Sequence, residues 1–499
     1  MGRGTAPQAH PHTRSTHPAP DPVRLTWAQP EDLIGHELRQ AAEDGRDADA
    51  EPARRTWLAA GGHPAPARAG ASPTPAPPRL RALAARLLDD LAALPSPLAP
   101  DEPHSWEAIR ATWPQPAPPP GGPGARPARQ VAPGAPGPGP GPTRNPAAPP
   151  AGYAARLEAA WTGRAVGCLL GKPVEKLPLH GIRTLARAAG NWPLDDWFTA
   201  RRVPPEVLAA YPWNRRSAPT SLAENIDGMP EDDDLNYPLL GLLLLQRHGK
   251  GFTTADVARL WLDELPAGRT FTAERVAYRN LLHGLEPPLT ATHHNPFREW
   301  IGALIRADVH GWTNPGDPAA AAAQAYRDAV LTHTANGLYA ALFVAAATAT
   351  AAGGRADVHT ALRSGLDFVP PRSRLAEAVR FGIRAAGENT DFDRVVDRLH
   401  ARYGHCHWVH AVPNTALIAA ALTHADGDFT RSVCRAVSGG WDTDSNGATA
   451  GALAALVSGE VPHRWSAPLK NRLATTVPGF DGIGFDALAH LTAQEAARS

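Results

Sequence analysis

Cysteine is scarce in this sequence, and its spacing excludes two common ways of stabilising a fold. The 499 residues include three cysteines, Cys168, Cys406 and Cys434, which lie far apart along the chain. Structural zinc sites and disulfide frameworks need cysteines in close, recurring spacings, so neither is expected here. Isolated thiols suit a reducing compartment, and we therefore expect a cytoplasmic protein.

Net charge and long apolar runs are also lacking. The sequence carries 49 basic and 49 acidic residues, so composition gives no reason to expect nucleic acid or a membrane surface as a partner. Its longest apolar stretch, residues 338–352, is rich in alanine and too short to cross a bilayer. The first twenty residues are polar and lack the apolar segment of a signal peptide. We expect neither secretion nor membrane insertion.

Patterns typical of β-sheets are absent as well. The sequence shows no strand-like alternation of any length, no strand–helix–strand succession and no G-x-G-x-x-G dinucleotide motif. Segments such as 254–265 and 272–282 instead have helical character. The sequence therefore predicts an all-α fold, a compact bundle of many helices.

Proline and glycine, by contrast, are abundant and concentrated in the first third of the chain. There are 53 prolines and 45 glycines, and residues 114–150 consist almost wholly of Pro, Gly, Ala and Arg. Residues 1–22 are predicted to be disordered, and helices are expected from about Pro30 and over residues 79–95. We therefore predict an accessory N-terminal region (1–113) with docked helices and no catalytic motif, a linker (114–150) and a globular domain (151–499).

The densest group of oxygen-bearing side chains lies in residues 438–456, at the start of a segment of small residues. Its turn and helix start contain Gly439, Gly440, Asp442, Asp444 and Ser445. The alanine- and glycine-rich helix that follows would let another backbone approach closely. Acids and hydroxyls at a helix start can be ordinary caps, and they can equally form a site for a hard cation such as Mg²⁺. The stretch alone leaves both interpretations open.

A second acidic cluster, residues 231–234, precedes the apolar run that follows Tyr237. Pro230 and that run predict that a helix begins at the cluster. Adjacent helical residues point about 100° apart, so the carboxylates can converge only at a helix start or in a turn. A run of acids is most often solvated surface, but these acids adjoin leucines that we expect to be buried. Repulsion between the carboxylates then favours a bound cation.

A third segment, residues 153–177, carries Gly163, Gly167 and Gly171 at intervals of four. Glycines at this spacing align on one side of a helix, where they allow close packing against another helix. Glu175 follows the helix. Taken alone, Glu175 is more often a surface acid than a functional one.

Together the three segments resemble the ADP-ribosylglycohydrolase family, over about residues 153–490. The family has an upstream Thr-Asp-Asp-Thr motif and a downstream Asp-x-Asp-Thr motif, which hold two Mg²⁺ or Mn²⁺ ions. Asp232 replaces a threonine of the first motif, and Leu235 stands where its last threonine would be and cannot ligate a metal. The metal ligands that the resemblance implies are Asp232, Asp233, Asp234, Asp442, Asp444 and Ser445.

The resemblance extends to further site residues. Glu175 matches the acid that ends the opening motif of the family, and Cys168 stands where many members have Asp. Trp300 and Ile301 replace a glycine and an asparagine in a loop that contacts ADP-ribose. A lone histidine such as His333 is more often a packing or capping residue. The implied catalytic residues are Glu175, Asp233 and Asp444, and the implied substrate contacts are Gly302, Arg306, His333, Asn336, Gly337, Gly439 and Gly440.

What the resemblance implies is a hydrolase that cleaves the bond between C1 of the distal ribose of ADP-ribose and an acceptor. That bond breaks through an oxocarbenium-like state, so water must reach the anomeric carbon and the leaving atom must be stabilised. Two cations would orient the ribose hydroxyls and activate water. The implied partner is ADP-ribose or an ADP-ribosylated substrate. Arginine, serine, another side chain, a nucleic-acid end and an O-linked ester all stay open as acceptors.

Two rival functions come from other classes. A terpene-synthase-like enzyme would also be all-α and bind Mg²⁺ and a diphosphate through two acidic clusters. It needs an aromatic-lined cavity, however, and aromatics make up 6% of this chain. A metal-free relative that only binds ADP-ribose is the second rival. Retention of nearly all the acidic ligands argues against it, because carboxylates packed together without a cation are costly.

Overall fold

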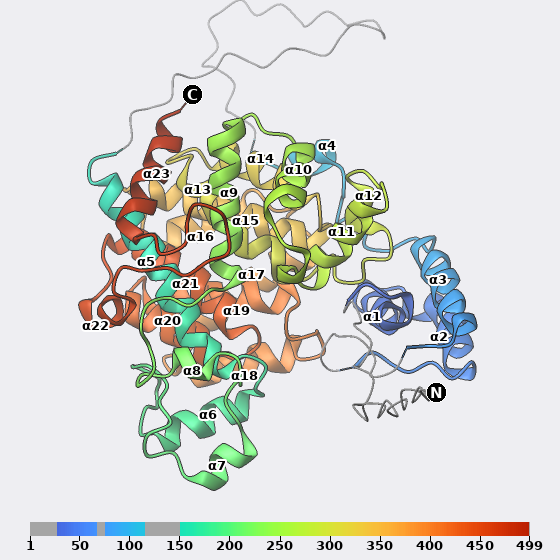
Figure 1. Ribbon diagram of the computed structural model, residues 1–499, viewed down its shortest axis with the longest axis horizontal. Helices are drawn as coiled ribbons and strands as arrows, with labels where there is room; N and C mark the ends of the chain where they lie inside the picture. The colour runs from blue at the N-terminus through green and yellow to red at the C-terminus, as the bar shows by residue number, and fades with distance from the viewer. Residues whose placement is uncertain (1–26, 67–74, 115–149, 499) are drawn as a thin grey trace, which may run out of the picture.

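The computed structural model describes residues 27–66, 75–114 and 150–498, and these residues form helices joined by turns and loops (Figure 1). They contain 23 α-helices and four short 3-10 helices, and the β-bridges among them are isolated pairs outside any strand. The predicted all-α, multi-helix fold is confirmed. The predicted disordered tail and nearly all of the predicted linker lie outside the described residues.

The helices begin close to the positions that local signals predict. Pro30 opens the first helix, and the acidic cluster opens α9, where the Asp232 side chain accepts a hydrogen bond from the Asp234 backbone N–H. The helices before the globular domain are α1 (Pro30–Glu43), α2 (Asp47–Ala59), α3 (Pro78–Ala92) and α4 (Trp106–Arg110). The first half of that domain contains α5 (Tyr153–Gly171), α6 (Leu179–Ala188), α7 (Pro205–Ala210), α8 (Ala218–Ser221), α9 (Asp233–His248), α10 (Thr254–Glu264), α11 (Thr272–Leu282), α12 (Leu289–Thr292) and α13 (Asp308–Trp312). The second half contains α14 (Pro318–Ala329), α15 (Ala335–Ala352), α16 (Val358–Leu366), α17 (Arg374–Glu388), α18 (Phe392–Tyr403), α19 (Ala411–Ala425), α20 (Phe429–Ser438), α21 (Thr443–Ser458), α22 (His463–Ser466) and α23 (Phe485–Ala497).

Helices α5 and α21 lie against each other along much of their length, because glycines of both helices face the contact (Figure 1). A Cβ atom added at Gly167 would lie 1.9 Å from the carbonyl oxygen of Gly447. One added at Gly163 would lie 2.5 Å from the carbonyl oxygen of Gly451. The predicted close packing of the glycine-rich helix is thus confirmed. It brings the C-terminal end of α5 beside the N-terminal end of α21.

Helix α15 is almost entirely buried. The helix begins three residues before the apolar stretch 338–352, which alone is too short to cross a bilayer. By length and composition it is the one helix of the described residues that could cross a membrane, but 94% of it lies inside the protein. It packs against α13, α14 and α16. Gly311 of α13 comes so close that an added Cβ atom would lie 2.6 Å from the Thr348 Cβ atom. Helix α15 therefore has the surroundings of a core helix.

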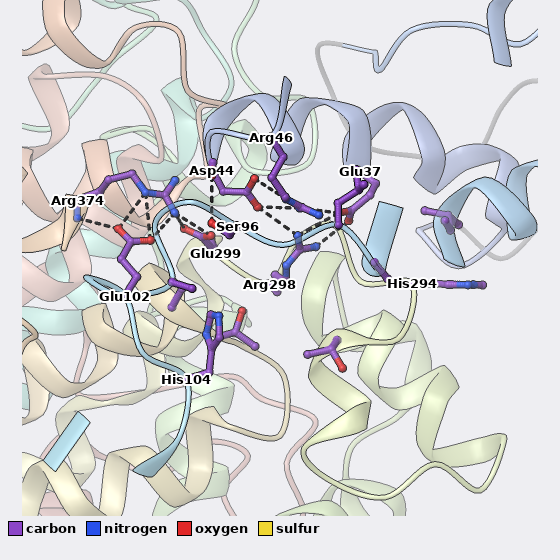
Figure 2. Close-up of a pocket in the computed structure, with 17 residues that line it drawn as sticks. Glu37, Asp44, Arg46, Ser96, Glu102, His104, His294, Arg298, Glu299 and Arg374 are labelled. Atoms are coloured by element: carbon purple, nitrogen blue, oxygen red, sulfur yellow. Dashed lines mark hydrogen bonds and ion pairs between the residues drawn. The ribbon is translucent and has the colours of Figure 1, made fainter. Parts of the chain in front are cut away.

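Helix α1 is docked on the globular domain through buried polar contacts (Figure 2). Glu37 of α1 accepts a 2.7 Å hydrogen bond from an Arg298 guanidinium nitrogen, and both side chains are largely buried. Gln40 of α1 donates a 2.9 Å hydrogen bond to Glu299 Oε1. A buried charge needs its partner, so these pairs fix where α1 sits.

The segment between α3 and α4 adds a second set of buried contacts. The Arg374 guanidinium lies 2.7 Å from Glu102 Oε2 and 2.8 Å from Glu299 Oε2 (Figure 2). Although burial opposes its ionisation, Arg374 holds the pKa of Glu299 at about 2. Beyond α4, the Trp113 indole donates a 3.1 Å hydrogen bond to the carbonyl oxygen of Phe368. The described parts of the N-terminal region therefore share a buried interface with the globular domain.

Candidate functional site

Three helix ends meet at the floor of a cavity of about 510 Å³. The C-terminal end of α5 continues through a 3-10 turn, Lys172–Val174, to Glu175. Helices α9 and α21 begin there, directly after Asp232 and Asp442. Helix N-termini carry partial positive charge, which favours carboxylates at this place. The acids and hydroxyl on the floor are Glu175, Asp232, Asp233, Asp442, Asp444 and Ser445.

Glu175, Asp442 and Asp444 form one cluster of potential metal ligands. Each offers a carboxylate oxygen, and the three oxygens lie within 4.8 Å of one another. The Thr443 hydroxyl donates a 2.8 Å hydrogen bond to the last carbonyl group of α5, which holds the two helix ends together. Asn214 donates a 2.8 Å hydrogen bond to Glu175 Oε2. The structure thus brings together three of the acids that the sequence predicts for the site.

A second cluster, Cys168, Asp232 and Asp234, shares Asp232 with the floor, extends beneath it and already has cationic partners. Its potential ligand atoms also lie within 4.8 Å of one another. The Lys172 ammonium forms an ion pair with Asp232 Oδ2, and an Arg164 guanidinium nitrogen lies 3.4 Å from Asp234 Oδ1. Burial opposes ionisation of Asp232, but the Lys172 ammonium holds its pKa below the usual range. Lys172 therefore offsets the negative charge of Asp232.

The electrostatics of the floor favour a divalent cation. Burial, and then the neighbouring Glu175 and Asp232 carboxylates, raise the pKa of Asp444 to about 7. Burial and nearby carboxylates also raise the pKa values of Asp233 and Asp442 well above their usual range. Crowded carboxylates resist ionisation on their own, so a divalent cation would stabilise their charged forms. An all-oxygen donor set of this kind fits Mg²⁺ or Mn²⁺.

Aromatic rings gather on the wall of the cavity, and the expectation from composition that no aromatic-lined cavity would form is wrong. The Trp300 and His407 rings stack with centroids 4.1 Å apart, and the Lys176 ammonium lies 5.6 Å from the Trp408 ring centroid. No periodic pattern in the sequence links these residues. Lys172 and Lys176 also line the cavity and were not predicted as site residues. Their positions on either side of Glu175 in the sequence were the one signal that could have identified them. The aromatic lining residues are Trp27, Tyr237, Phe271, Trp300, His407 and Trp408.

Of the predicted substrate contacts, Gly302 lines the cavity, whereas Arg306 lies outside its lining. Arg306 is buried, and its guanidinium lies 2.8 Å from Asp328 Oδ1 and 3.0 Å from Glu274 Oε1. Two carboxylates of the protein therefore pair with the Arg306 guanidinium, which we expected to contact the substrate.

His333 and Asn336 also lie outside the lining of the cavity. His333 is fully buried with Nδ1 2.6 Å from the Thr332 hydroxyl, and burial lowers its pKa well below the usual range. Asn336 donates hydrogen bonds of 3.0 Å to Glu102 and 2.9 Å to Glu299. Asn336 therefore belongs to the buried network that docks the N-terminal region.

Three predicted glycines allow close packing or a tight turn outside the cavity lining. A Cβ atom added at Gly337 would lie 2.5 Å from the Arg298 carbonyl oxygen, and one added at Gly439 would lie 2.4 Å from a Leu417 methyl carbon. Gly440 has φ of 83°, a conformation that side chains other than hydrogen rarely adopt. Gly439 and Gly440 let the chain turn into α21, whereas Gly337 lies within α15 and allows close packing there.

Comparisons with known proteins found one matching family model and similar solved structures. A family model described as ADP-ribosylglycohydrolase matches residues 149–497. Among solved structures, a chain from an "ADP-ribosylglycohydrolase-related protein complex" is 22% identical in sequence, with a TM-score of 0.42. That similarity covers 69% of this chain and 98% of the other. No curated protein matches the sequence. The matched family range contains all the acids of the floor but not Trp27.

Proposed function

Because the chain belongs to the ADP-ribosylglycohydrolase family, we propose that it hydrolyses the bond between C1 of the distal ribose of ADP-ribose and an acceptor group. Family membership by itself supports glycohydrolase chemistry in general. The observation that supports the specific proposal is the acidic floor, where Glu175, Asp442 and Asp444 come together from two helix ends. The cavity above this floor has about 510 Å³, which suits a ligand of nucleotide size.

We assign the binding of two Mg²⁺ or Mn²⁺ ions to acids of this floor and the layer beneath it. When bound, such ions orient ribose hydroxyls and lower the pKa of a bound water. The proposed ligands are Asp233, Asp234, Asp442 and Asp444. Ser445 donates a 3.3 Å hydrogen bond to Asp234 Oδ2, and Asp232 caps α9 and pairs with Lys172. We therefore give Ser445 and Asp232 supporting roles.

The stoichiometry of metal binding tests this assignment directly. Equilibrium dialysis with Mn²⁺ should give two ions per chain. A value of one would mean that the Lys172 ammonium takes the second cation position, because it already compensates Asp232.

Glu175 is the residue that we propose to move the proton. Its Oε2 atom accepts the hydrogen bond from Asn214, and its Oε1 atom lies 2.5 Å from the Lys176 ammonium, so the carboxylate is held in place. In the reaction, a water oxygen bonds to C1 as the bond from C1 to the acceptor breaks. Glu175 takes the proton of that water and then passes a proton to the departing acceptor atom.

Two substitutions separate binding from chemistry. Asp444→Asn removes a proposed metal ligand, so turnover of an ADP-ribosylated substrate should fall by orders of magnitude. Glu175→Gln should keep metal-dependent ADP-ribose binding while turnover drops, the pattern of a group that acts mainly in the transition state. Asp263→Asn, on the exposed face of α10, is the matched control and should behave as the wild type. Calorimetry with ADP-ribose and a release assay measure the two effects, and wild-type turnover in Asp444→Asn would contradict the mechanism.

The rival functions give different results in the same assays. A protein that only binds ADP-ribose would give a binding signal in calorimetry. Its wild type would release no ADP-ribose from any modified acceptor. A terpene-synthase-like enzyme would bind a prenyl diphosphate with Mg²⁺ and no ADP-ribose. The family match already weighs against that enzyme, although the aromatic wall of the cavity resembles what it needs.

A further inference from the structure

One wall of the cavity comes from outside the matched family range. Trp27, just before α1, lines the cavity together with Phe271, and the two rings meet at 76° with centroids 5.6 Å apart. The Arg275 guanidinium lies 4.9 Å from a Trp27 ring centroid. Next to Trp27, the carbonyl oxygen of Ala28 accepts a 2.7 Å hydrogen bond from Arg279. These contacts hold the indole against the globular domain.

Helix α1 continues this contact to the second aromatic pair of the wall. The ring of His36 meets that of Trp300 nearly at right angles, with centroids 5.9 Å apart. Trp300 in turn stacks on His407, and both residues line the cavity. Burial lowers the pKa of His36 to about 3, so its ring is neutral and packs as an uncharged plate. The N-terminal region thus supplies one part of the aromatic wall and supports another.

Buried polar contacts fix the part of the N-terminal region that contributes to the aromatic wall. Glu37, which follows His36, and Gln40, one turn further along α1, make the buried contacts to Arg298 and Glu299 that dock the helix. Trp300 directly follows Arg298 and Glu299 in the sequence. The position of the aromatic wall is therefore fixed by the same interface that fixes α1.

The floor and the wall suit different parts of one substrate. Carboxylates that hold cations match the hydroxyls of a ribose. A purine base instead presents a flat, weakly polar face that stacks on aromatic side chains. On this basis, which rests on the proposed function, we propose that Trp27 is a specificity-determining residue of the active site. Trp27 and Phe271 form the surface on which the adenine base of ADP-ribose packs, so the N-terminal region is part of the substrate site.

The experiment compares two ligands on the full chain with Mg²⁺ present. ADP-ribose carries the base, and ribose 5-phosphate lacks it and is measured by competition. Trp27→Ala should weaken ADP-ribose binding by about 5- to 150-fold, the range for loss of one base–aromatic stack. It should leave ribose 5-phosphate binding unchanged, and Trp27→Phe should restore most of the affinity. In turnover assays KM should rise while kcat stays near the wild-type value.

A matched control comes from the same region. Trp106 of α4 packs on Trp113 and Tyr326, with ring centroids 5.1 and 4.7 Å apart, and does not line the cavity. Trp106→Ala should therefore leave the affinity for ADP-ribose unchanged. Equal losses for both ligands in Trp27→Ala would reduce Trp27 to a structural support and overturn the inference, as would no loss at all. A wild-type protein that binds neither ligand would instead overturn the proposed function.

Discussion

The glycine contact between α5 and α21 allows a quantitative test of how the site is assembled. Gly167→Ala places a methyl carbon 1.9 Å from the Gly447 carbonyl oxygen, whereas an ordinary contact needs at least 3.4 Å. The helices must therefore separate locally by about 1.5 Å, because neither backbone can rotate out of the way. Overpacking of this kind typically costs about 1–3 kcal/mol. Because the added methyl group meets backbone atoms, we take the upper end of this range. The better helix propensity of alanine returns about 1 kcal/mol at most, which leaves a net loss of about 2 kcal/mol.

The consequence should reach the metal site as well as the stability. Separation of the helices displaces the start of α21, which carries the proposed metal ligands Asp442 and Asp444, so the affinity for Mn²⁺ should fall together with the free energy of unfolding. Urea denaturation and Mn²⁺ titration measure the two quantities. Gly387→Ala in α17 is the control, since a Cβ atom there meets nothing within 4 Å, and it should be neutral or slightly stabilising. If Gly167→Ala matches that control in both measurements, the argument from close packing is refuted.

Three further predictions concern pH, metal and the N-terminal region. Burial raises the pKa of Glu43 from 4.5 to about 7, so the native state holds this proton more tightly than the unfolded state does. The wild type should therefore lose about 3 kcal/mol as the pH rises from 4.5 to 7, and Glu43→Gln should be the more stable protein in urea at pH 8 but not at pH 4. Removal of divalent cations with EDTA should lower the melting temperature, because cations bound to the native state stabilise it by mass action; an unchanged melting curve would argue against the metal site. A chain that begins at Gly152 leaves Glu299 and Arg374 without their N-terminal partners, and calorimetry should show a much lower melting temperature or no folded protein.

Features with local causes could be predicted from the sequence. Pro30 and the acidic run at Asp232 mark helix starts, because capping depends on residues within one turn of each other. The interval between Gly163, Gly167 and Gly171 predicts one close-packed face for the same reason. The two acidic motifs, at residues 231–234 and 438–456, also contain acids that the fold brings together on the floor of one cavity.

Features that depend on pairing between distant segments could not be predicted. Gln40 and Glu299 are 259 residues apart in the sequence, and no local pattern around either residue predicts their hydrogen bond. Arg306 lies at a position that resembles a substrate-binding loop, but its burial beside Asp328 is decided by the packing of α14. Overall composition was an equally poor guide, because the few aromatic residues are unevenly distributed and several of them line the cavity.

The buried pair of Glu102 and Arg374 also sets an order of events during synthesis. Its members lie 272 residues apart, and a ribosome adding about 5–20 residues per second needs roughly 15 to 55 s to travel that distance. During this interval Glu102 can only be solvated by water, and α1 to α3 lack the surface that they later cover. Docking of α1 to α3 therefore cannot be completed until Arg374 has been synthesised. Until then the surface of α1 to α3 that later packs on the globular domain is accessible to chaperones and proteases.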